Sequence, residues 1–436
     1  MSTKHIKFLF TLVAGFCLMA GPVLGQMSKG QSGTFALTNA TIETVSNGQV
    51  SGTLLIRDGK IAALGEDVSI PSDATTIDCE GMTIYPGLID GGTRVGLAEV
   101  GSISLTQDFR EVGDVNPQVQ ALTAVNPSSV VIPVTRVNGV TTVISAPAGG
   151  LFSGTAALIN LHGYTPDQMY AGFKGIVMNF PSTGRRGRRD RRTPEEVKKA
   201  MEKRLKTLND IWKKAEGYAN LMDAAQAGKG EKPTYYPEME ALAAVVKGDM
   251  PLMIEVNAAA DIEAAIGWVE GKEIKAIFTG VGEGWRVADK LAASKIPVIA
   301  GPVLTTPSRG YDRYDRPYAN AGIMHKAGVK VAIRSNESEN ARNLPYNAGF
   351  AAAYGMGKEA ALRAVTLTAA EIFGVSDQLG SLEVGKSATL FVADGDPFEP
   401  KTNITHLFIS GWNVPVDSRH TRLYEEFLER SPGLKK

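Results

Sequence analysis

The sequence predicts an α/β protein: a TIM (β/α)8-type barrel inserted in a small composite β-sandwich domain that both chain ends build. Three observations predict this. Between about residues 84 and 375, short apolar runs alternate with helical patterns, as in a parallel sheet covered on both faces. Strand-like runs precede this region, and strand character returns after residue 380. A doubly wound open sheet is the alternative, but no glycine fingerprint follows the first strand.

The first strand-like segment, residues 27–85, is expected to form one half of the β-sandwich. Short runs at 35–38 and 40–43 alternate in part between apolar and polar residues. Runs at 53–57 and 60–64 flank Asp58-Gly59, a strong hairpin signal because both turn positions need positive φ.

The middle segment, residues 86–375, is long enough for a barrel, which typically needs about 250 residues. Its candidate buried strands, the first of which begins just before the segment, are 84–89, 141–145, 175–179, 252–256, 276–279, 297–300 and 329–333. Its candidate helices are 194–225, 261–270, 284–293, 319–327 and 358–373. Residues 376–417 return to strand character and should complete the β-sandwich, while 418–436 should form a C-terminal helix and tail.

The N-terminal residues 1–26 have the pattern of a signal peptide. Basic residues precede an apolar run at 8–20, and small residues follow at a suitable cleavage position. The run is short for a bilayer, although a membrane anchor stays an alternative. We therefore expect an exported, periplasmic or secreted protein without a membrane span. Cleavage would leave Cys79 as its one cysteine, so no internal disulfide is expected.

Charge does not point to a nucleic-acid partner. The 436 residues contain 46 basic and 46 acidic side chains, so net charge favours neither nucleic acid nor an anionic membrane. Residues 185–192 are rich in arginine, but no aromatic residues interleave and acidic residues follow at once. A solvated loop is expected there, with nucleic-acid or heparin binding as the alternative.

Several motifs occur in a consistent order along the chain. Residues 86–97 read PGLIDGGTRVGL and residues 139–143 read GVTTV. Further motifs are NLP at 343–345 with AG at 348–349, ALRAVT at 361–366 with AAEIFGV at 369–375, and GSLEVGK at 380–386 with DGDP at 394–397. Together they resemble the amidohydrolase superfamily, in its exported, imidazolonepropionase-like branch. The resemblance implies a TIM barrel with a composite β-sandwich, and hydrolysis of non-peptide carbon–nitrogen bonds at a zinc-like metal.

The metal ligands of that family are not retained. The resemblance places its His-x-His pair at Gly92 and Arg94, its strand-five histidine near Glu255, and its strand-six histidine near Thr279. Its strand-eight aspartate falls at Asn336, with a possible shift of one residue. The histidines left after cleavage are not placed to share a metal: His162, His325, His406 and His420. No metal ligands and no cofactor are expected, and the catalytic residues stay unknown.

Charged and aromatic residues at the carboxyl ends of the predicted strands are the candidates for a pocket. A guanidinium from Arg94 or Arg334 is expected to pair with Glu255 where the family holds its metal; the alternative is that these arginines point to solvent. The loop at 311–318 is expected to be either a lid with aromatic walls or a plain packing loop. The candidate pocket residues are Arg94, Glu255, Thr279, Tyr311, Tyr314, Arg334 and Asn336.

Two functional hypotheses from different classes follow. The resemblance implies an amidohydrolase-like hydrolase that acts on carbon–nitrogen bonds without the usual mononuclear or binuclear metal site. The alternative is a catalytically inactive exported protein that uses the barrel mouth to bind a ligand or as a scaffold. A metal site of carboxylates alone, suited to Mg²⁺ or Ca²⁺, is a third possibility. The expected partner is a small-molecule ligand or substrate, and a homo-oligomer is compatible with the sequence.

Overall fold

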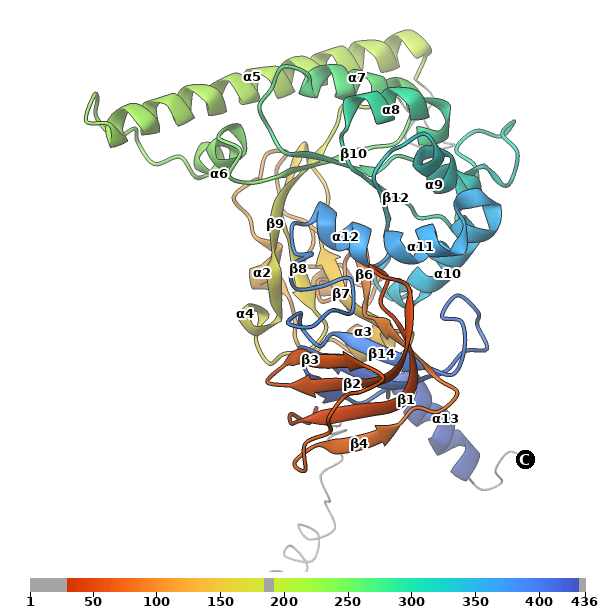
Figure 1. The fold of residues 1–436 in the computed structure, drawn as a ribbon. Coiled ribbons are helices and arrows are strands. Elements are labelled where there is room, and N and C mark those ends of the chain that lie inside the picture. The colour runs from red at the N-terminus through yellow and green to blue at the C-terminus, as the bar shows by residue number, and fades with distance from the viewer. Residues whose placement is uncertain (1–29, 184–191, 431–436) are drawn as a thin grey trace, which may run out of the picture.

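The structure, a computed structural model, describes residues 30–183 and 192–430. The predicted signal peptide, nearly all of the arginine-rich run and the end of the C-terminal tail lie outside the described residues. The described chain contains two β-sheets, sheet A near one end of the molecule and sheet B in its middle (Figure 1). The long helix α5 (Pro194–Gln226) lies at the end farthest from sheet A.

Sheet A is built from both chain ends. Its strands are β1 (Phe35–Glu43), β2 (Gln49–Arg57), β3 (Lys60–Gly65), β4 (Thr75–Asp78), β5 (Thr83–Pro86), β14 (Leu390–Ala393), β15 (Ile404–Ile409) and β16 (Trp412–Val414). They lie in the order β16-β15-β14-β5-β1-β2-β3, and β4 pairs with β1. The predicted turn joins β2 to β3, with Asp58 at φ 51° and Gly59 at φ 77°. The antiparallel pairing of β14 with β5 joins the two ends of the chain.

Sheet B forms a nearly closed barrel in which strand order follows the chain. Its strands are β6 (Leu88–Thr93), β7 (Val140–Ser145), β8 (Phe152–Asn160), β9 (Tyr170–Asn179), β10 (Leu252–Val256), β11 (Ala276–Gly280), β12 (Val298–Ala300) and β13 (Val331–Ile333). Backbone hydrogen bonds just beyond β13 reach β6, from Asn336 N to Gly92 O (3.0 Å) and from Arg94 N to Glu337 O (3.0 Å). These observations confirm the predicted fold class.

Strand β8 departs from the all-parallel prediction. It runs antiparallel to both β7 and β9, and the glycines at 149, 150 and 154 do not favour a strand in the sequence. Gly154 lies within the strand at φ 135°, where a Cβ would come within 2.8 Å of Val119 O. The predicted first strand, 84–89, is also wrong as one element, since it divides at Gly87 into β5 of sheet A and β6 of sheet B.

Most of the helices connect strands of sheet B and cover the barrel, whereas the last helix follows the last strand of sheet A. They are α2 (Ala121–Ala124), α3 (Val131–Arg136), α4 (Pro166–Met169), α5, α6 (Pro237–Val246), α7 (Ala259–Val269), α8 (Ala288–Ser294), α9 (Arg316–Lys326), α10 (Leu344–Ala351), α11 (Lys358–Ala364), α12 (Leu367–Ile372) and α13 (Arg419–Glu429). A capping box between Thr193 and Glu196 starts α5, with a proline in its first turn. The helix predicted at 358–373 is divided into α11 and α12. None of the helices in the described ranges combines the length and apolar character that crossing a bilayer requires.

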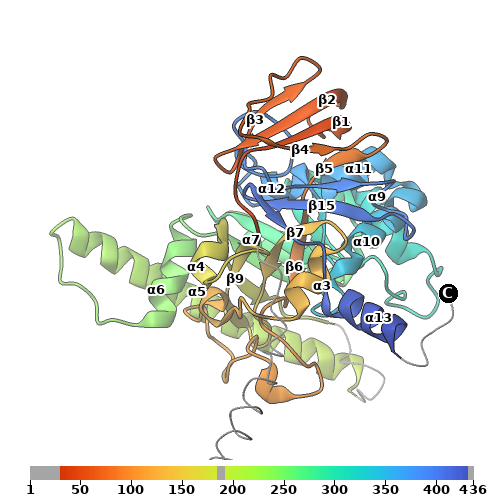
Figure 2. The ribbon, with the colours of Figure 1, turned by 90° about the horizontal axis from the view of Figure 1, so that it is seen from below.

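The barrel and sheet A share an apolar contact around Phe391 of β14. The Phe391 ring stacks on Tyr85 at 5.4 Å between centroids and lies against Gly139, where a Cβ would come within 2.9 Å of the ring. Arg363 of α11 donates from Nη1 to Val45 O at 2.9 Å, which adds a polar link to sheet A. The two sheets therefore pack as one body (Figure 2).

Candidate functional site

An ion pair occupies the centre of the barrel mouth. Glu255 lies near the carboxyl end of β10 and Arg334 directly follows β13, so both lie at the face where barrels of this kind place their active sites. Arg334 donates from Nη1 to Glu255 Oε2 and from Nη2 to Glu255 Oε1, each at 2.8 Å. This fork is the strong, directional form of an arginine–carboxylate contact. The predicted guanidinium–Glu255 pair is therefore present, with Arg334 as the cation.

Neighbouring groups complete the hydrogen bonding of this pair. Thr279 of β11 donates to Glu255 Oε2 at 2.7 Å, and Asn257 donates to Oε1 at 3.0 Å. Arg334 Nε donates to Gly301 O at 3.2 Å. Burial disfavours the charged carboxylate, but the charge of Arg334 and the hydrogen bonds outweigh burial and lower the pKa of Glu255. Glu255 is thus ionised and fully engaged at neutral pH.

Two glycines make room for the ion pair. At Gly92 of β6, an added Cβ would come within 2.9 Å of Arg334 Cδ. At Gly280, which ends β11 at φ 85°, a Cβ would come within 2.6 Å of Glu255 Oε1 and 2.5 Å of Asn257 Oδ1. A side chain at position 92, where the family resemblance places a histidine, would therefore collide with the guanidinium arm of Arg334.

Arg94 lies at the same mouth without a carboxylate partner. Its guanidinium lies 4.7 Å from the centroid of the Phe109 ring, and that of Arg110 lies 5.2 Å from the same centroid. Burial lowers the pKa of Arg94, and the positive charges of Arg110 and Arg334 lower it further. Within the described chain, the Arg94 guanidinium makes no hydrogen bond or ion pair. The mouth therefore contains a half-buried cation that is free to contact a ligand.

Asp90 ties β6 to the segment after β13. It is fully buried, and its Oδ1 accepts hydrogen bonds from Gly92 N at 3.1 Å and Ser335 N at 3.0 Å. Burial raises the pKa of Asp90 to about 7, although the hydrogen bonds from Ser335 and Gly92 oppose the rise. Because Asp90 is not exposed in the mouth, it positions the backbone of Gly92 and Ser335 instead of contacting a ligand.

The loop after β12 lies beside the ion pair. Residues 305–308 of this loop line a cavity of about 190 Å³ together with Asn257 and Glu283. Arg309 fastens the loop by donating from Nε and Nη2 to the two carboxylate oxygens of buried Glu283, at 2.5 and 2.6 Å. An ion pair between Arg286 and Asp312 adds a second attachment. The loop that lines the mouth cavity is therefore held in place by two ion pairs.

The structure brings together some of the predicted pocket residues and separates others. Glu255, Thr279 and Arg334 form one hydrogen-bonded cluster, and Arg94 lies within electrostatic reach of it. Tyr311 and Tyr314 are 77% and 68% exposed and do not line the mouth cavity. Asn336 is also exposed, in a left-handed conformation at φ 55°. A ligand-contacting role for these last three residues stays a prediction.

Sequence reasoning missed several residues of the site. Asn257 follows Glu255 by two positions and points to the same mouth, a signal available from the period of a strand. Glu283 and Arg309 lie 26 positions apart, and nothing in the sequence pairs them. Arg110 was missed because its loop carries no recognisable motif.

The side chains at the mouth do not fit a zinc-like metal. Among the residues that the structure describes, no group of three or more His, Cys, Asp or Glu side chains could hold a metal ion. Both Glu255 oxygens are engaged by Arg334, whose guanidinium puts a positive charge beside the carboxylate. Zinc sites require neutral nitrogen or anionic donors that are not already paired with a cation.

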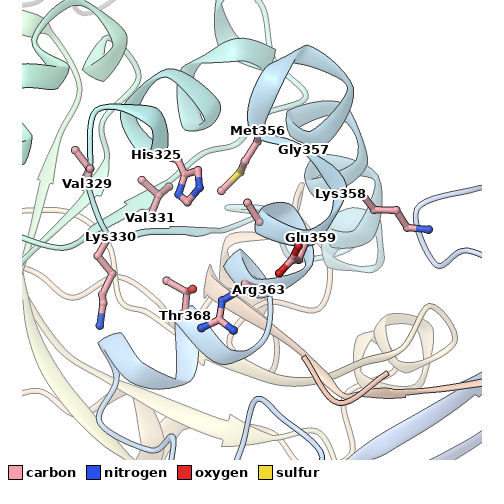
Figure 3. Close-up of a pocket in the computed structure, with 12 residues that line it drawn as sticks. His325, Val329, Lys330, Val331, Met356, Gly357, Lys358, Glu359, Arg363 and Thr368 are labelled. Atoms are coloured by element: carbon pink, nitrogen blue, oxygen red, sulfur yellow. The ribbon is translucent and has the colours of Figure 1, made fainter. Parts of the chain in front are cut away.

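A larger cavity, of about 620 Å³, lies at the other end of the barrel (Figure 3). It is lined by the end of α9, the start of β13 and the start of α11, including His325, Lys330 and Arg363. Lys330 pairs with Glu371 at 2.8 Å, and the rim residue Lys358 pairs with Asp396 at 2.8 Å. Because the lysines are paired and the cavity is far from the carboxyl ends of the strands, the mouth is the stronger candidate site.

Comparison with known proteins decides the family. Residues 83–414 match the sequence model of the amidohydrolase family. The chain belongs to the amidohydrolase family. This amidohydrolase-family chain is 25% identical over 397 residues to an imidazolonepropionase of Mesorhizobium japonicum, covering 84% of the chain and 93% of that protein. It is 21% identical over 399 residues to the amidohydrolase tasK of Hapsidospora irregularis, where it spans only 39% of the relative's length.

Solved structures agree with the family fold. An amidohydrolase from Thermotoga maritima is 25% identical, with a TM-score of 0.75 over 87% of this amidohydrolase-family chain and 99% of that structure. A molinate hydrolase has a TM-score of 0.55 at 17% identity, over 88% and 96% of the two chains, and this second likeness concerns the fold alone. The fold and family that the motifs predicted are confirmed.

Proposed function

We propose that this amidohydrolase-family protein is exported and binds a small anionic molecule at its barrel mouth, without metal-dependent hydrolysis. The observation that carries the proposal is the fork between Arg334 and Glu255 in the centre of the mouth. A metal ion there would compete with the guanidinium for both carboxylate oxygens. Losing a metal removes both the Lewis acid and the activated water on which this kind of hydrolysis depends.

The charge around the mouth supports an anionic ligand. Glu255 is neutralised by Arg334, whereas Arg94 makes no hydrogen bond or ion pair with the residues that the structure describes, and the guanidinium groups of Arg94 and Arg110 both lie over the Phe109 ring. A carboxylate or phosphate group could bind the guanidinium groups of Arg94 and Arg110, because arginine recognises these anions through paired hydrogen bonds.

A second candidate function is hydrolysis of a non-peptide carbon–nitrogen bond, in which water is added to release an amine and an acid. It is favoured by the family match and by the imidazolonepropionase and amidohydrolase relatives. In this case the reaction would have to use groups at the mouth other than the family's metal ligands, because Gly92 and Arg94 stand where the resemblance places the His-x-His pair.

Elemental analysis separates these functions when it is joined to a binding and activity screen. The protein is purified without chelator and without a histidine tag, and its metal content is measured before small carboxylates and amides are tested by calorimetry and for amine release. We expect less than about 0.1 metal ion per chain, binding that survives EDTA, and its loss in Arg94→Ala. Near-stoichiometric zinc, manganese or iron would overturn the proposal, and amine release by metal-free protein would establish the second function.

A further inference from the structure

A third cavity, of about 670 Å³, lies between α3, the end of β8 and α13. Helix α13 packs beside α3 (Figure 2). Because β8 runs against its neighbours, its carboxyl end lies at the end of the barrel opposite the mouth. This cavity is therefore separate from the candidate site described above, and its volume is within the range typical of small-molecule pockets.

One face of α13 forms a wall of the cavity. Arg419, Arg422, Leu423 and Glu426 line it, and their spacing of three, four and seven residues places them on one side of the helix. The facing wall is apolar and comes from α3, the end of β8 and α4, through Ile132, Leu161 and Met169. The cavity thus combines a charged rim with an apolar interior.

The charged rim is positive. Arg136 is only 7% exposed, donates from Nη1 to Leu161 O at 3.0 Å, and leaves Nε without a partner in the described chain. Burial lowers the pKa of Arg136 to about 10, opposed by the charge of Asp417, so it stays charged at neutral pH. The Arg419 guanidinium makes no hydrogen bond or ion pair with any described residue. Two guanidinium groups at this cavity therefore lack a full set of partners.

The acidic groups nearby are already engaged. Asp417 accepts from Arg422 at 2.7 Å, and Glu426 pairs with Arg430 at 2.5 Å. An anion entering the cavity would thus meet Arg136 and Arg419 without displacing an existing ion pair. Burying a charge such as Arg136 is costly unless it is matched by a counter-charge or hydrogen bonds, so an anion beside this guanidinium is favoured over a neutral ligand.

We propose that this cavity binds a small organic anion with one acidic group and an apolar body. The acidic group contacts Arg136 and Arg419, and the body lies against Leu161 and Leu423. Nothing in this proposal depends on the function of the barrel mouth.

The test uses two fluorescent probes of the same aromatic body with the full protein. The anionic probe is 8-anilinonaphthalene-1-sulfonate, and the neutral probe is N-phenyl-1-naphthylamine. Both probes are measured in the Arg94→Ala background, which removes the anion site proposed at the barrel mouth, and there we expect the anionic probe to bind one per chain, with a Kd raised about three-fold by Arg419→Gln and about ten-fold by Arg136→Met. The neutral probe should be unaffected by Arg419→Gln. Leu423→Trp, which narrows the apolar part of the cavity, should weaken binding of both probes.

A matched control locates the probe. Arg57→Gln removes the same charge from an exposed strand of sheet A and should not change the Kd. If Arg136→Met does not fold cooperatively in a thermal melt, Arg419→Gln and Leu423→Trp decide the question. An unchanged Kd in Leu423→Trp, or a Kd raised as much by Arg57→Gln as by Arg419→Gln, would overturn the proposal.

Discussion

Arg334 is the residue on which the barrel mouth is organised. Its side chain is 8% exposed, is held by Glu255 and the carbonyl of Gly301, and fills space left by glycines on two strands. The pair could be anticipated from the sequence because charged residues at the carboxyl ends of barrel strands converge on one face. The sequence could not show which arginine forms the pair, since Arg94 and Arg334 both reach that face.

Removing one member of the pair should destabilise the protein more than removing both. Glu255→Gln leaves Arg334 buried without its counter-charge and should lower the free energy of unfolding by about 3 kcal/mol. The double variant Glu255→Leu with Arg334→Leu should recover most of this loss, because no charge remains buried. Urea denaturation of the three proteins measures the difference, and a double variant that is no more stable than Glu255→Gln would contradict this account.

Asp90 should give the stability of the protein an unusual pH dependence. Its pKa is raised from 3.8 to about 7 by burial, so the folded protein retains a proton that the unfolded chain has lost. The stabilisation is complete below about pH 4 and is lost as pH rises toward 7, by at most about 1.4 kcal/mol per pH unit. Urea denaturation at pH 5 and at pH 8 measures this effect. Between these two pH values, the free energy of unfolding should fall further for the wild type than for Asp90→Asn. Equal losses would mean that Asp90 is ionised in the fold.

The sequence predicted the bounds of the strands best where the apolar pattern was strong. The apolar runs gave β7, β10, β11 and β13 to within about two residues, as expected for buried strands. β8 was missed because glycine normally weakens a strand, whereas here Gly154 allows the close approach of Val119 O. The path of the loop after β12 could not be predicted, because it depends on the distant partner of Arg309.

The ion pair between Arg309 and Glu283 should hold the loop after β12 in place. Arg309→Ala removes both hydrogen bonds to the buried carboxylate, so backbone amides of residues 304–313 should exchange with deuterium at least about ten-fold faster. Exchange in α5 should be unchanged and serves as the internal reference. If protection of the loop is retained, the Arg286–Asp312 pair alone is sufficient to fasten it.

At the scale of the whole molecule, the two chain ends close one sheet around an insertion of more than 250 residues. Phe391 joins this sheet to the barrel by packing on Tyr85 and against Gly139. The composite organisation could be predicted because strand character appears on both sides of the barrel segment. The contacts between sheet A and the barrel could not be predicted, since they join residues that are far apart in the sequence.

Sheet A and the barrel should therefore unfold together. Phe391→Ala removes a fully buried ring and should cost about 3 to 5 kcal/mol of unfolding free energy. Near-ultraviolet circular dichroism and far-ultraviolet circular dichroism should give coincident transitions for the wild type. Leu423→Ala, at the partly exposed terminal helix, should cost much less; separate transitions in wild type would show that the two parts are independently stable.

The reversed strand β8 also bears on the order of events during folding. β7, β8 and β9 are consecutive in the chain and form an antiparallel meander, so their pairing closes only short loops. Each pair of parallel barrel strands can form only after a longer connecting segment has brought the two strands together. The meander should consequently be the nucleus on which the barrel is assembled, with high φ-values for Ile144, Leu158 and Val177 and low ones for the strands that arrive last, β12 and β13.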